Sequence, residues 1–180
     1  MRIAFRAALI VLVIALSAGP ALATSSVLSK ADPKGDVAVA KTKKLSTSKK
    51  KSIDIDRATV LLLDNGRYRF KIRMKKLYTS KKWDQMVFVS SSFPGDDPRT
   101  VSIGFRVRNS TAAYAYDDET EENCGLKVKR DGRTVSVDVP ARCAPHDGQT
   151  VRLDTYTGHW QTDEKPYSRD HMNVGKWPSE

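Results

Sequence analysis

One stretch, residues 65–77, constrains what this chain can fold into more than any other. It reads Asn-Gly-Arg-Tyr-Arg-Phe-Lys-Ile-Arg-Met-Lys-Lys-Leu, so apolar and basic side chains alternate along it. Successive side chains of a β-strand point to opposite faces of the sheet, and the alternation therefore predicts a strand with an apolar face and a cationic face. We call its cationic positions the basic ladder: Arg67, Arg69, Lys71, Arg73 and Lys75.

The pair Asn65-Gly66 precedes this strand and is typical of a type I′ hairpin turn, in which both central residues have positive φ. A two-residue turn at this place brings apolar side chains together on the inward face, which fixes the expected register. The expected inward pairs are Leu63 with Tyr68, Leu61 with Phe70 and Thr59 with Ile72.

Asp131-Gly132 is a second hairpin signal of the same kind. Pairing Arg130 with Arg133 again gives an apolar inward face. The expected inward pairs are Val128 with Val135, Leu126 with Val137 and Cys124 with Val139. Pro140 ends this ladder because proline has no N–H to donate.

Other segments also alternate or are short and apolar, namely residues 37–40, 53–63, 83–92, 101–107, 112–116 and 151–155. After residue 23 the sequence has no clear amphipathic helical pattern. Short strands separated by turn residues are typical of antiparallel sandwiches and barrels. The sequence thus predicts an all-β fold, a single antiparallel β-sandwich of about seven to nine strands.

The first residues have the features of an export signal. Arg2 and Arg6 precede an apolar run at residues 7–16, and Ala21-Leu22-Ala23 supplies the small residues of a cleavage site. We therefore predict a signal peptide at residues 1–23, a flexible segment at 24–36, the sandwich domain at 37–157 and a loosely packed tail at 158–180. The mature chain is expected to be secreted or otherwise extracytoplasmic, without a transmembrane segment. Its formal charge falls from +10 to +8 with the loss of two arginines.

Cys124 and Cys143 are the only cysteines in the sequence. In an exported chain two such cysteines favour a disulfide over a metal site or a redox-active thiol, which would call for a CxxC motif. The second hairpin supports the pairing, because residues 140–142 can turn the chain back toward Cys124. The sequence predicts the disulfide Cys124–Cys143.

The basic ladder is the most specific surface feature of the sequence. Its side chains follow one another on one strand face at a spacing of about 6.6 Å. Further basic residues occupy outward positions of other expected strands: Arg106, Arg108, Lys127, Lys129 and Arg152. If these strands are neighbours, the face suits an anionic polymer such as teichoic acid, uronic acid or anionic lipid. Few outward aromatics accompany it for stacking bases or sugars, nucleic acid is disfavoured, and basic strands also discourage edge-to-edge aggregation.

A second basic segment, residues 41–51, contains six lysines among Ser and Thr. It fits either a solvated loop kept flexible by self-repulsion or an anion-binding arm. Two acidic groups offer oxygen ligands for calcium, namely residues 117–122 and the set Asp32, Asp36 and Asp54. Residues 117–122 lack the spacing and glycine of an EF-hand loop, and we assign no metal site or cofactor from the sequence.

The histidines His146, His159 and His171 have no metal-binding spacing, and the sequence contains no nucleophile motif. A hydrolase built from scattered residues would use His159 or His171 with a nearby carboxylate. A histidine within hydrogen-bond reach of both an Asp and a Ser would favour that alternative.

Asp32-Pro-Lys-Gly-Asp36, followed by a strand that opens at Asp54-Ile55 and one that ends near Leu77, resembles the start of secreted DOMON-like β-sandwiches. That group includes the family 9 carbohydrate-binding modules. Residues 137–140, leading to Cys143, resemble the late strand of small exported bacterial members. The resemblance covers roughly residues 32–156 and implies a sandwich that binds a ligand, in some members sugar or haem, without catalysis. Sugar-binding members stack the ligand between aromatics, for which Trp83 and Trp160 are the candidates; no haem-ligating pair can be carried over.

These observations favour a secreted, non-catalytic β-sandwich protein that binds an anionic polymer or glycan of the cell envelope through the basic ladder. The alternatives are a carbohydrate-binding module for a neutral glycan and an unrecognised secreted hydrolase.

Overall fold

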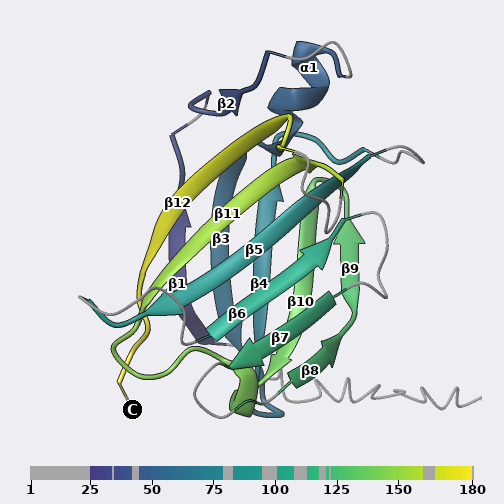
Figure 1. The fold of residues 1–180 in the computed structure, drawn as a ribbon. Helices are drawn as coiled ribbons and strands as arrows, with labels where there is room; N and C mark the ends of the chain where they lie inside the picture. Colours follow the sequence, from purple (N-terminus) through teal and green to yellow (C-terminus); the bar gives the residue numbers. More distant parts are fainter. Residues whose placement is uncertain are drawn as a thin grey trace, which may run out of the picture.

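The computed structural model describes residues 25–33, 35–41, 45–78, 83–94, 101–107, 113–117, 121, 123–159 and 165–179. These residues form two antiparallel sheets that face each other, so the predicted all-β sandwich is confirmed (Figure 1). The expected signal peptide lies outside the described residues. Within the described ranges, no helix is long and apolar enough to cross a membrane.

The two sheets, A and B, contain all the strands of the described residues. The strand order of sheet A is β1 (Ser25–Ala31), β3 (Ile55–Leu62), β4 (Arg67–Met74), β10 (Thr134–Pro140) and β9 (Val128–Asp131). The strand order of sheet B is β2 (Ala38–Val39), β12 (Ser168–Lys176), β11 (Thr150–Gly158), β5 (Asp84–Ser92), β6 (Val101–Arg106), β7 (Ala113–Asp117) and β8 (Asn123–Leu126). The short helices are α1 (Thr47–Lys50), η1 (Lys51–Ile53) and η2 (Ala141–Cys143).

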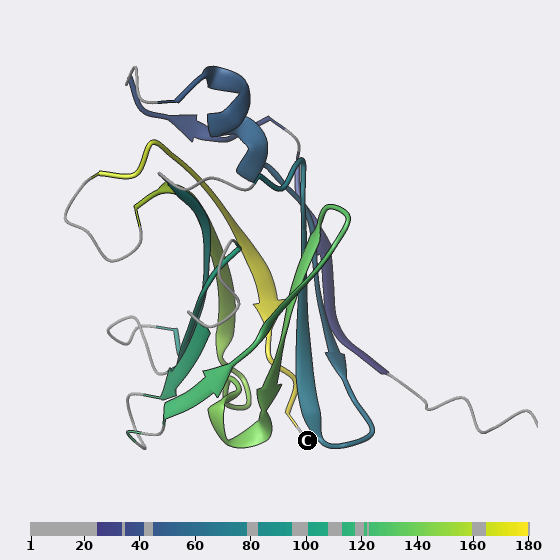
Figure 2. The same cartoon turned by 90° about the vertical axis from the view of Figure 1, so that its right-hand side faces the viewer.

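The main apolar core fills the space between the sheets. Its fully buried side chains include Ile72 and Met74 of β4, Ile103 and Phe105 of β6, and Leu153 of β11. Burying alternate residues of each strand between the sheets leaves the other face of each sheet to the solvent. Figure 2 shows the sandwich from its edge, with the strands of sheet B bowed toward sheet A, so that the outer face of sheet B is concave.

The first hairpin turns through three residues, 64–66, rather than the expected two. The amide of Gly66 donates to the carbonyl of Leu63 (2.9 Å), and the amide of Leu63 donates to the carbonyl of Arg67 (2.9 Å). Gly66 has φ 72°, whereas Asn65 does not have the positive φ that a type I′ turn requires. A type I turn followed by a glycine in the left-handed region is the common three-residue hairpin loop.

This extra loop residue shifts the pairing of β3 with β4 by one position. Val60, not Leu61, lies opposite Phe70. Because side chains alternate along a strand, the slip moves the whole β3 set to the other face. Ala58 and Val60 are buried in the core, and the predicted inward positions of Thr59 and Leu61 are wrong.

The second hairpin turns at Gly132-Arg133 instead of Asp131-Gly132. Asp131 pairs with Thr134, so the register differs from the prediction by two positions. Gly132 has φ 54° and Arg133 does not have positive φ, which identifies a type II′ turn. A shift of two positions keeps every side chain on its expected face, and the valines of β10 are buried as predicted.

The strand expected before this second turn is divided between the two sheets. β8 pairs with β7 in sheet B, whereas β9 pairs with β10 in sheet A. The predicted pairing of Cys124 with Val139 is therefore wrong, since Cys124 lies opposite Ala115. The chain crosses from one sheet to the other at Lys127, which joins the sheets along this edge.

Two segments that we expected to be flexible or loose form strands. β1 pairs with β3 along its whole length, although Ser25, Ser29 and Lys30 make it a polar edge strand. β12 pairs with β2 on one side and with β11 on the other. With the divided strand, β1 and β12 bring the described part of the chain to twelve strands.

The segment after β12 is also packed against the core. The ring of Trp177 meets Tyr68 edge-on at 4.8 Å between ring centroids and stacks on Phe70 at 6.0 Å. Trp177 is almost completely buried. The loosely packed tail expected at residues 158–180 is thus replaced, in its described part, by a strand and an aromatic cluster.

The lysine-rich segment is not a solvated loop at residues 45–51. Helices α1 and η1 cover one end of the sandwich, with the side chain of Ser46 accepting a hydrogen bond from the amide of Lys49 (3.4 Å) (Figure 1). Lys50 is buried, and its Nζ donates to the carbonyl of Ala40 (2.9 Å). The hydroxyl of Ser168 in β12 donates to the carbonyl of Lys50 (2.6 Å), which fastens the helix to sheet B.

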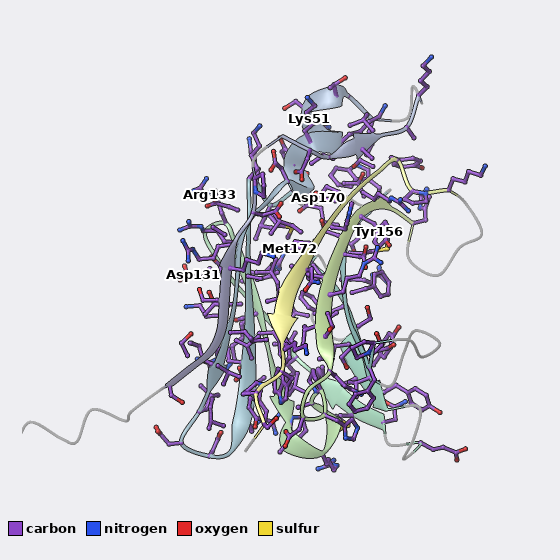
Figure 3. The ribbon with its side chains drawn as sticks, turned by 90° about the vertical axis from the view of Figure 1, so that its left-hand side faces the viewer. Lys51, Asp131, Arg133, Tyr156, Asp170 and Met172 are labelled. Carbon is purple, nitrogen blue, oxygen red and sulfur yellow. A yellow bond between two sulfur atoms is a disulfide. The ribbon has the colours of Figure 1, made fainter. Side chains whose placement is uncertain are left out.

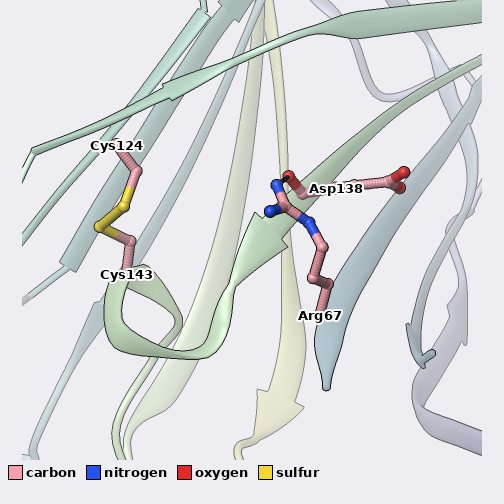
Figure 4. Close-up of a disulfide and its surroundings, with 4 residues drawn as sticks. All are labelled: Arg67, Cys124, Asp138 and Cys143. Atoms are coloured by element: carbon pink, nitrogen blue, oxygen red, sulfur yellow. Dashed lines mark hydrogen bonds between the residues drawn. A yellow bond between two sulfur atoms is a disulfide. The ribbon is translucent and has the colours of Figure 1, made fainter. Parts of the chain in front are cut away.

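The predicted disulfide Cys124–Cys143 is present, with the two Cα atoms 6.4 Å apart. Cys124 lies in β8 of sheet B, and Cys143 ends η2, directly after β10 of sheet A (Figure 4). The bond therefore links the two sheets at the end opposite to α1 (Figure 1). The described residues contain no free cysteine.

Removing this bond should destabilise the sandwich. A cross-link that closes a loop of this length is expected to contribute about 3 kcal/mol, mainly by restricting the unfolded chain. We expect Cys124→Ala/Cys143→Ala to lower the free energy of unfolding by about 2–4 kcal/mol in a urea titration, and wild type in reductant to behave like the variant. An unchanged unfolding midpoint would mean that packing alone holds β8 to the turn after β10.

Candidate functional site

The outer face of sheet B carries rows of side chains that cross the strands side by side. The central row is His171, Asp154, Phe88, Gly104, Tyr114 and Gly125. The row on one side is Asn173, Arg152, Ser90, Ser102, Tyr116 and Asn123. The row on the other side is Arg169, Tyr156, Met86 and Arg106. We call this surface the sheet B face; it mixes aromatic rings with hydroxyl, amide and charged groups.

Three aromatic rings lie near the middle of the sheet B face. Phe88 and Tyr156 meet edge-on with their centroids 5.7 Å apart, and Tyr156 points away from the core (Figure 3). The ring of Tyr114 lies over Gly104, since a Cβ at that glycine would come within 2.8 Å of the tyrosine ring. The glycine therefore allows the ring of Tyr114 to lean across β6 toward Phe88.

Two adjoining hollows lie on this face. One, of about 320 Å³, is lined by Phe88, Ser90, Ser102, Tyr114, Asp154 and Tyr156. The other, of about 350 Å³, is lined by Ser90, Ser92, Thr150, Arg152, Asp154, Tyr156 and Asn173. Both lie in the size range of sites for small molecules, about 300–1,000 Å³. Tyr156, Asp154 and Ser90 border both hollows, so the two form one continuous groove.

Two of the arginines beside the groove are paired with aspartates. The guanidinium of Arg152 lies 3.2 Å from a carboxylate oxygen of Asp154, and that of Arg106 lies 3.0 Å from one of Asp84. Asp84 is buried beneath the face, and its negative charge neutralises the positive charge of Arg106. These two pairs add little net charge to the groove, and Arg169, exposed beside Tyr156, adds a positive charge at one edge of it.

The basic ladder lies on the opposite surface, the outer face of sheet A, where neighbouring strands supply carboxylates. Arg69 makes two hydrogen bonds to Asp138 of β10, of 2.6 and 2.8 Å, and Lys129 of β9 makes a third, of 3.0 Å. Arg67 donates to the main-chain carbonyl of Asp138 (2.7 Å) (Figure 4). The hydrogen bonds from Arg69, supported by Lys129, lower the pKa of Asp138 to about 2, and the bond to Asp138 raises the pKa of Arg69.

The rest of the ladder differs from residue to residue. A register shift in β3 places Asp56 beside Arg73, and the two form an ion pair at 2.5 Å. Lys75 follows the strand, with its Nζ 4.0 Å from a carboxylate oxygen of Asp54. Lys71 is exposed and has no ion pair among the described residues. Only part of the predicted cationic face is therefore available to a ligand.

The other basic residues do not extend the ladder into one patch. Arg106 and Arg152 lie on the sheet B face, on the far side of the sandwich from β4. Lys129 lies on sheet A but is bound to Asp138, and Lys127 lies where the chain crosses between the sheets. Arg108 lies outside the described residues.

Four aspartates gather at the end of the sandwich that α1 and β2 cover, and we call them the Asp cluster: Asp32, Asp36, Asp54 and Asp170. Burial and the neighbouring charges of Asp170, Asp36 and Asp54 raise the pKa of Asp32 to about 6. Burial also raises the pKa of Asp170 (Figure 3), although the amide of Ile55 donates to its carboxylate (2.8 Å). The sequence grouped the first three; Asp170 was missed because it lies in the segment expected to be a tail.

The remaining sequence candidates do not form a site in the described structure. Trp83 is buried in a small cluster with Leu45 and Tyr167, and Trp160 lies outside the described residues, as does most of the acidic stretch 117–122. No hydrogen bond joins the ring of His171 to an Asp or a Ser of the described residues. His159 packs edge-on against Tyr167, with the ring centroids 6.0 Å apart.

Neither a scan against protein-family models nor a search of curated proteins finds a match to this chain.

The sheet B face was missed by sequence reasoning, although one signal for it is present. In β7 the small residue Ala115 is buried between Tyr114 and Tyr116, which places both tyrosines on the outer face. Phe88 gave no such signal, because the apolar run around it hides which face it takes.

The ion pair at Asp138 predicts how stability depends on pH. The pKa of Asp138 in the folded state, about 2, is below its ordinary value of 3.8, so the pair stabilises the folded state above pH 3.8. This contribution is lost as the pH falls from 3.8 toward 2. We expect Asp138→Asn to lower the free energy of unfolding at neutral pH, and the difference from wild type to vanish near pH 2 in urea titrations.

The matched control is Asp131→Asn, which removes an exposed carboxylate at the β9–β10 turn that makes no ion pair with a described residue. Its difference from wild type should be small at every pH. A difference for Asp138→Asn that stays constant down to pH 2 would show that the pair with Arg69 does not stabilise the fold.

Proposed function

We propose that this protein is a secreted, non-catalytic glycan-binding protein and that the groove of the sheet B face binds a neutral sugar chain. The observation that carries the proposal is the composition of the groove. Phe88, Tyr114 and Tyr156 line the same hollow as Ser90, Ser102 and Asp154. Rings and hydrogen-bonding groups alternate there within one concave surface.

This mixture fits the chemistry of a sugar. One face of a pyranose ring is covered by C–H groups with a slight positive charge, which are attracted to the electron-rich face of an aromatic ring. The hydroxyls at its rim donate and accept hydrogen bonds, for which Ser, Asn, Asp and Arg provide partners. A groove that continues through both hollows suits a chain of sugar units rather than a single one.

The charge around the groove favours a neutral glycan. Arg152 and Arg106 are each held by an aspartate, so neither is an open site for a carboxylate or sulfate of the ligand. The export signal pattern of the sequence and the disulfide Cys124–Cys143 support a place outside the cytoplasm, where such polymers occur.

The basic ladder supports a second candidate function, binding of an anionic polymer of the cell envelope through sheet A. Lys71 is exposed and unpaired among the described residues, and Arg57 of β3 lies directly opposite Arg73 of β4. Lys71 and Arg57 therefore leave positive charge on the outer face of sheet A. Such binding would depend steeply on salt, because it would rest on ion pairing.

Affinity electrophoresis in gels containing neutral plant or bacterial polysaccharides tests the first proposal. Wild type should be retarded, and the retardation should change little with added salt. Tyr156→Ala should weaken binding about 5- to 150-fold, since an aromatic stacking contact contributes about 1–3 kcal/mol. Gly104→Ala, which pushes the ring of Tyr114 aside without removing it, should also weaken binding.

The matched control is Lys71→Glu, on the other sheet, which should bind neutral polysaccharide like wild type. Heparin chromatography of the same proteins tests the second candidate. Retention on heparin that is lost in Lys71→Glu and at high salt, with no retardation by any neutral polysaccharide, would replace the first proposal with the second.

A further inference from the structure

The Asp cluster is assembled from segments that are far apart in the chain. Asp32 follows β1, Asp36 precedes β2, Asp54 precedes β3 and Asp170 lies in β12. Carboxylate oxygens of Asp32, Asp36 and Asp170 lie within 4.8 Å of one another. Carboxylates at this spacing repel each other, so the fold brings them together against their electrostatic preference.

Asp54 adds a buried carboxylate at the same end of the sandwich. It is only 2% exposed, and its Oδ1 has no hydrogen-bond partner; the buried Oδ2 of Asp32 has none either. The charge of Asp54 acts on both Asp32 and Asp170, so its carboxylate adds to the negative charge around them. A buried carboxylate oxygen without a hydrogen-bond donor destabilises the fold unless a positively charged group or a metal ion lies against it.

The nearby positively charged side chains do not bind these two carboxylate oxygens. Lys75 lies 4.0 Å from the other oxygen of Asp54, Oδ2, and is itself largely exposed. His171 is close enough to act on the charge of Asp32, but its side chain makes no hydrogen bond to a described residue. The carboxylate of Asp170 is held in place by the amides of Ile55 (2.8 Å) and His171 (2.9 Å), so its position is fixed before any ion arrives.

We propose that the Asp cluster binds a calcium ion through carboxylate oxygens of Asp32, Asp36 and Asp170, with the buried carboxylate of Asp54 adding negative charge beside the ion. Calcium is bound by oxygen ligands at about 2.3–2.6 Å, so ligands on opposite sides of one ion are about 4.6–5.2 Å apart. Carboxylate oxygens of Asp32, Asp36 and Asp170 lie within 4.8 Å of one another, which matches this separation. The set contains no thiolate or imidazole, which zinc would prefer, and calcium tolerates irregular geometry better than magnesium does.

The ion would join the two sheets at the end of the sandwich opposite to the disulfide. Asp32 and Asp54 flank strands of sheet A, Asp170 lies in sheet B, and Asp36 lies on the connection between β1 and β2 (Figure 1). Calcium should therefore stabilise the fold whether or not the sheet B face binds a glycan. Sites of extracellular modules bind calcium with dissociation constants of about 10⁻⁴–10⁻³ M, which we expect here.

Thermal unfolding of wild type in EDTA and in CaCl2 at about 10 mM tests this site. Tm should rise by roughly 3–10 °C with calcium, as mass action requires for a site of this affinity, and by less with MgCl2. Isothermal titration should give one calcium per chain. No Tm shift and no heat of binding at this concentration, or an equal response to magnesium, would overturn the proposal.

The decisive variant is Asp36→Asn, because Asp36 is exposed and makes no hydrogen bond to a described residue, so the fold should tolerate the change. In EDTA the variant should be as stable as wild type or more stable, since one repelling charge is gone, yet it should lose most of the response to calcium. Asp131→Asn is the control and should respond like wild type. A variant that is destabilised in EDTA and keeps the full calcium response would show that Asp36 has only a structural role.

Discussion

The structure depends on one requirement, the burial of one apolar face of each sheet against the other. Ile72 and Met74 of β4 and Phe105 of β6 are fully buried in the core. The residues next to them along each strand face outward and are mostly basic. Since successive residues alternate between core and solvent, the core fixes which residues reach each outer surface. The two outer faces can then carry unrelated chemistry without disturbing the fold.

The two faces differ in how their charges are arranged. On sheet A the ladder arginines Arg69 and Arg73 are largely neutralised by Asp138 and Asp56, so much of the apparent cationic surface is an internal ion-pair network. On sheet B the ring of Tyr156 lies beside polar groups in a concave groove. The physical difference favours the sheet B face as the place where a ligand meets open, shaped surface.

The sequence predicted those features that follow from alternation alone. The two faces of β4 and the sandwich class are of this kind, whereas the disulfide Cys124–Cys143 was predicted from the presence of two cysteines in a chain with an export signal. The register of the first hairpin was not predicted correctly, because Asn65-Gly66 fits both a two-residue and a three-residue loop. One extra loop residue reverses the faces of β3. β12 was not predicted as a strand because its inward positions include Ser168 and Asp170, which make polar contacts and do not belong to the apolar core.

The candidate sites needed long-range pairing that no local pattern contains. Asp170 joins Asp32 only because β12 begins at the end of the sandwich where β1 ends, and Tyr156 joins Phe88 only because β11 pairs with β5. Which residues share a groove is decided by the strand order of sheet B, and the sequence gives no direct signal for that order. The residue types were visible in the sequence, but their neighbours were not.

The most direct measurement is NMR mapping of backbone amide shifts during titration with neutral cello-, xylo- and manno-oligosaccharides. The central claim is that the groove of the sheet B face is the binding surface. It predicts shifts concentrated in β5, β6, β7 and β11, strongest near Phe88, Tyr114 and Tyr156, with β3, β4 and β10 unaffected. Shifts confined to β4 and its neighbours in sheet A, or no shifts with any of these sugars, would contradict it.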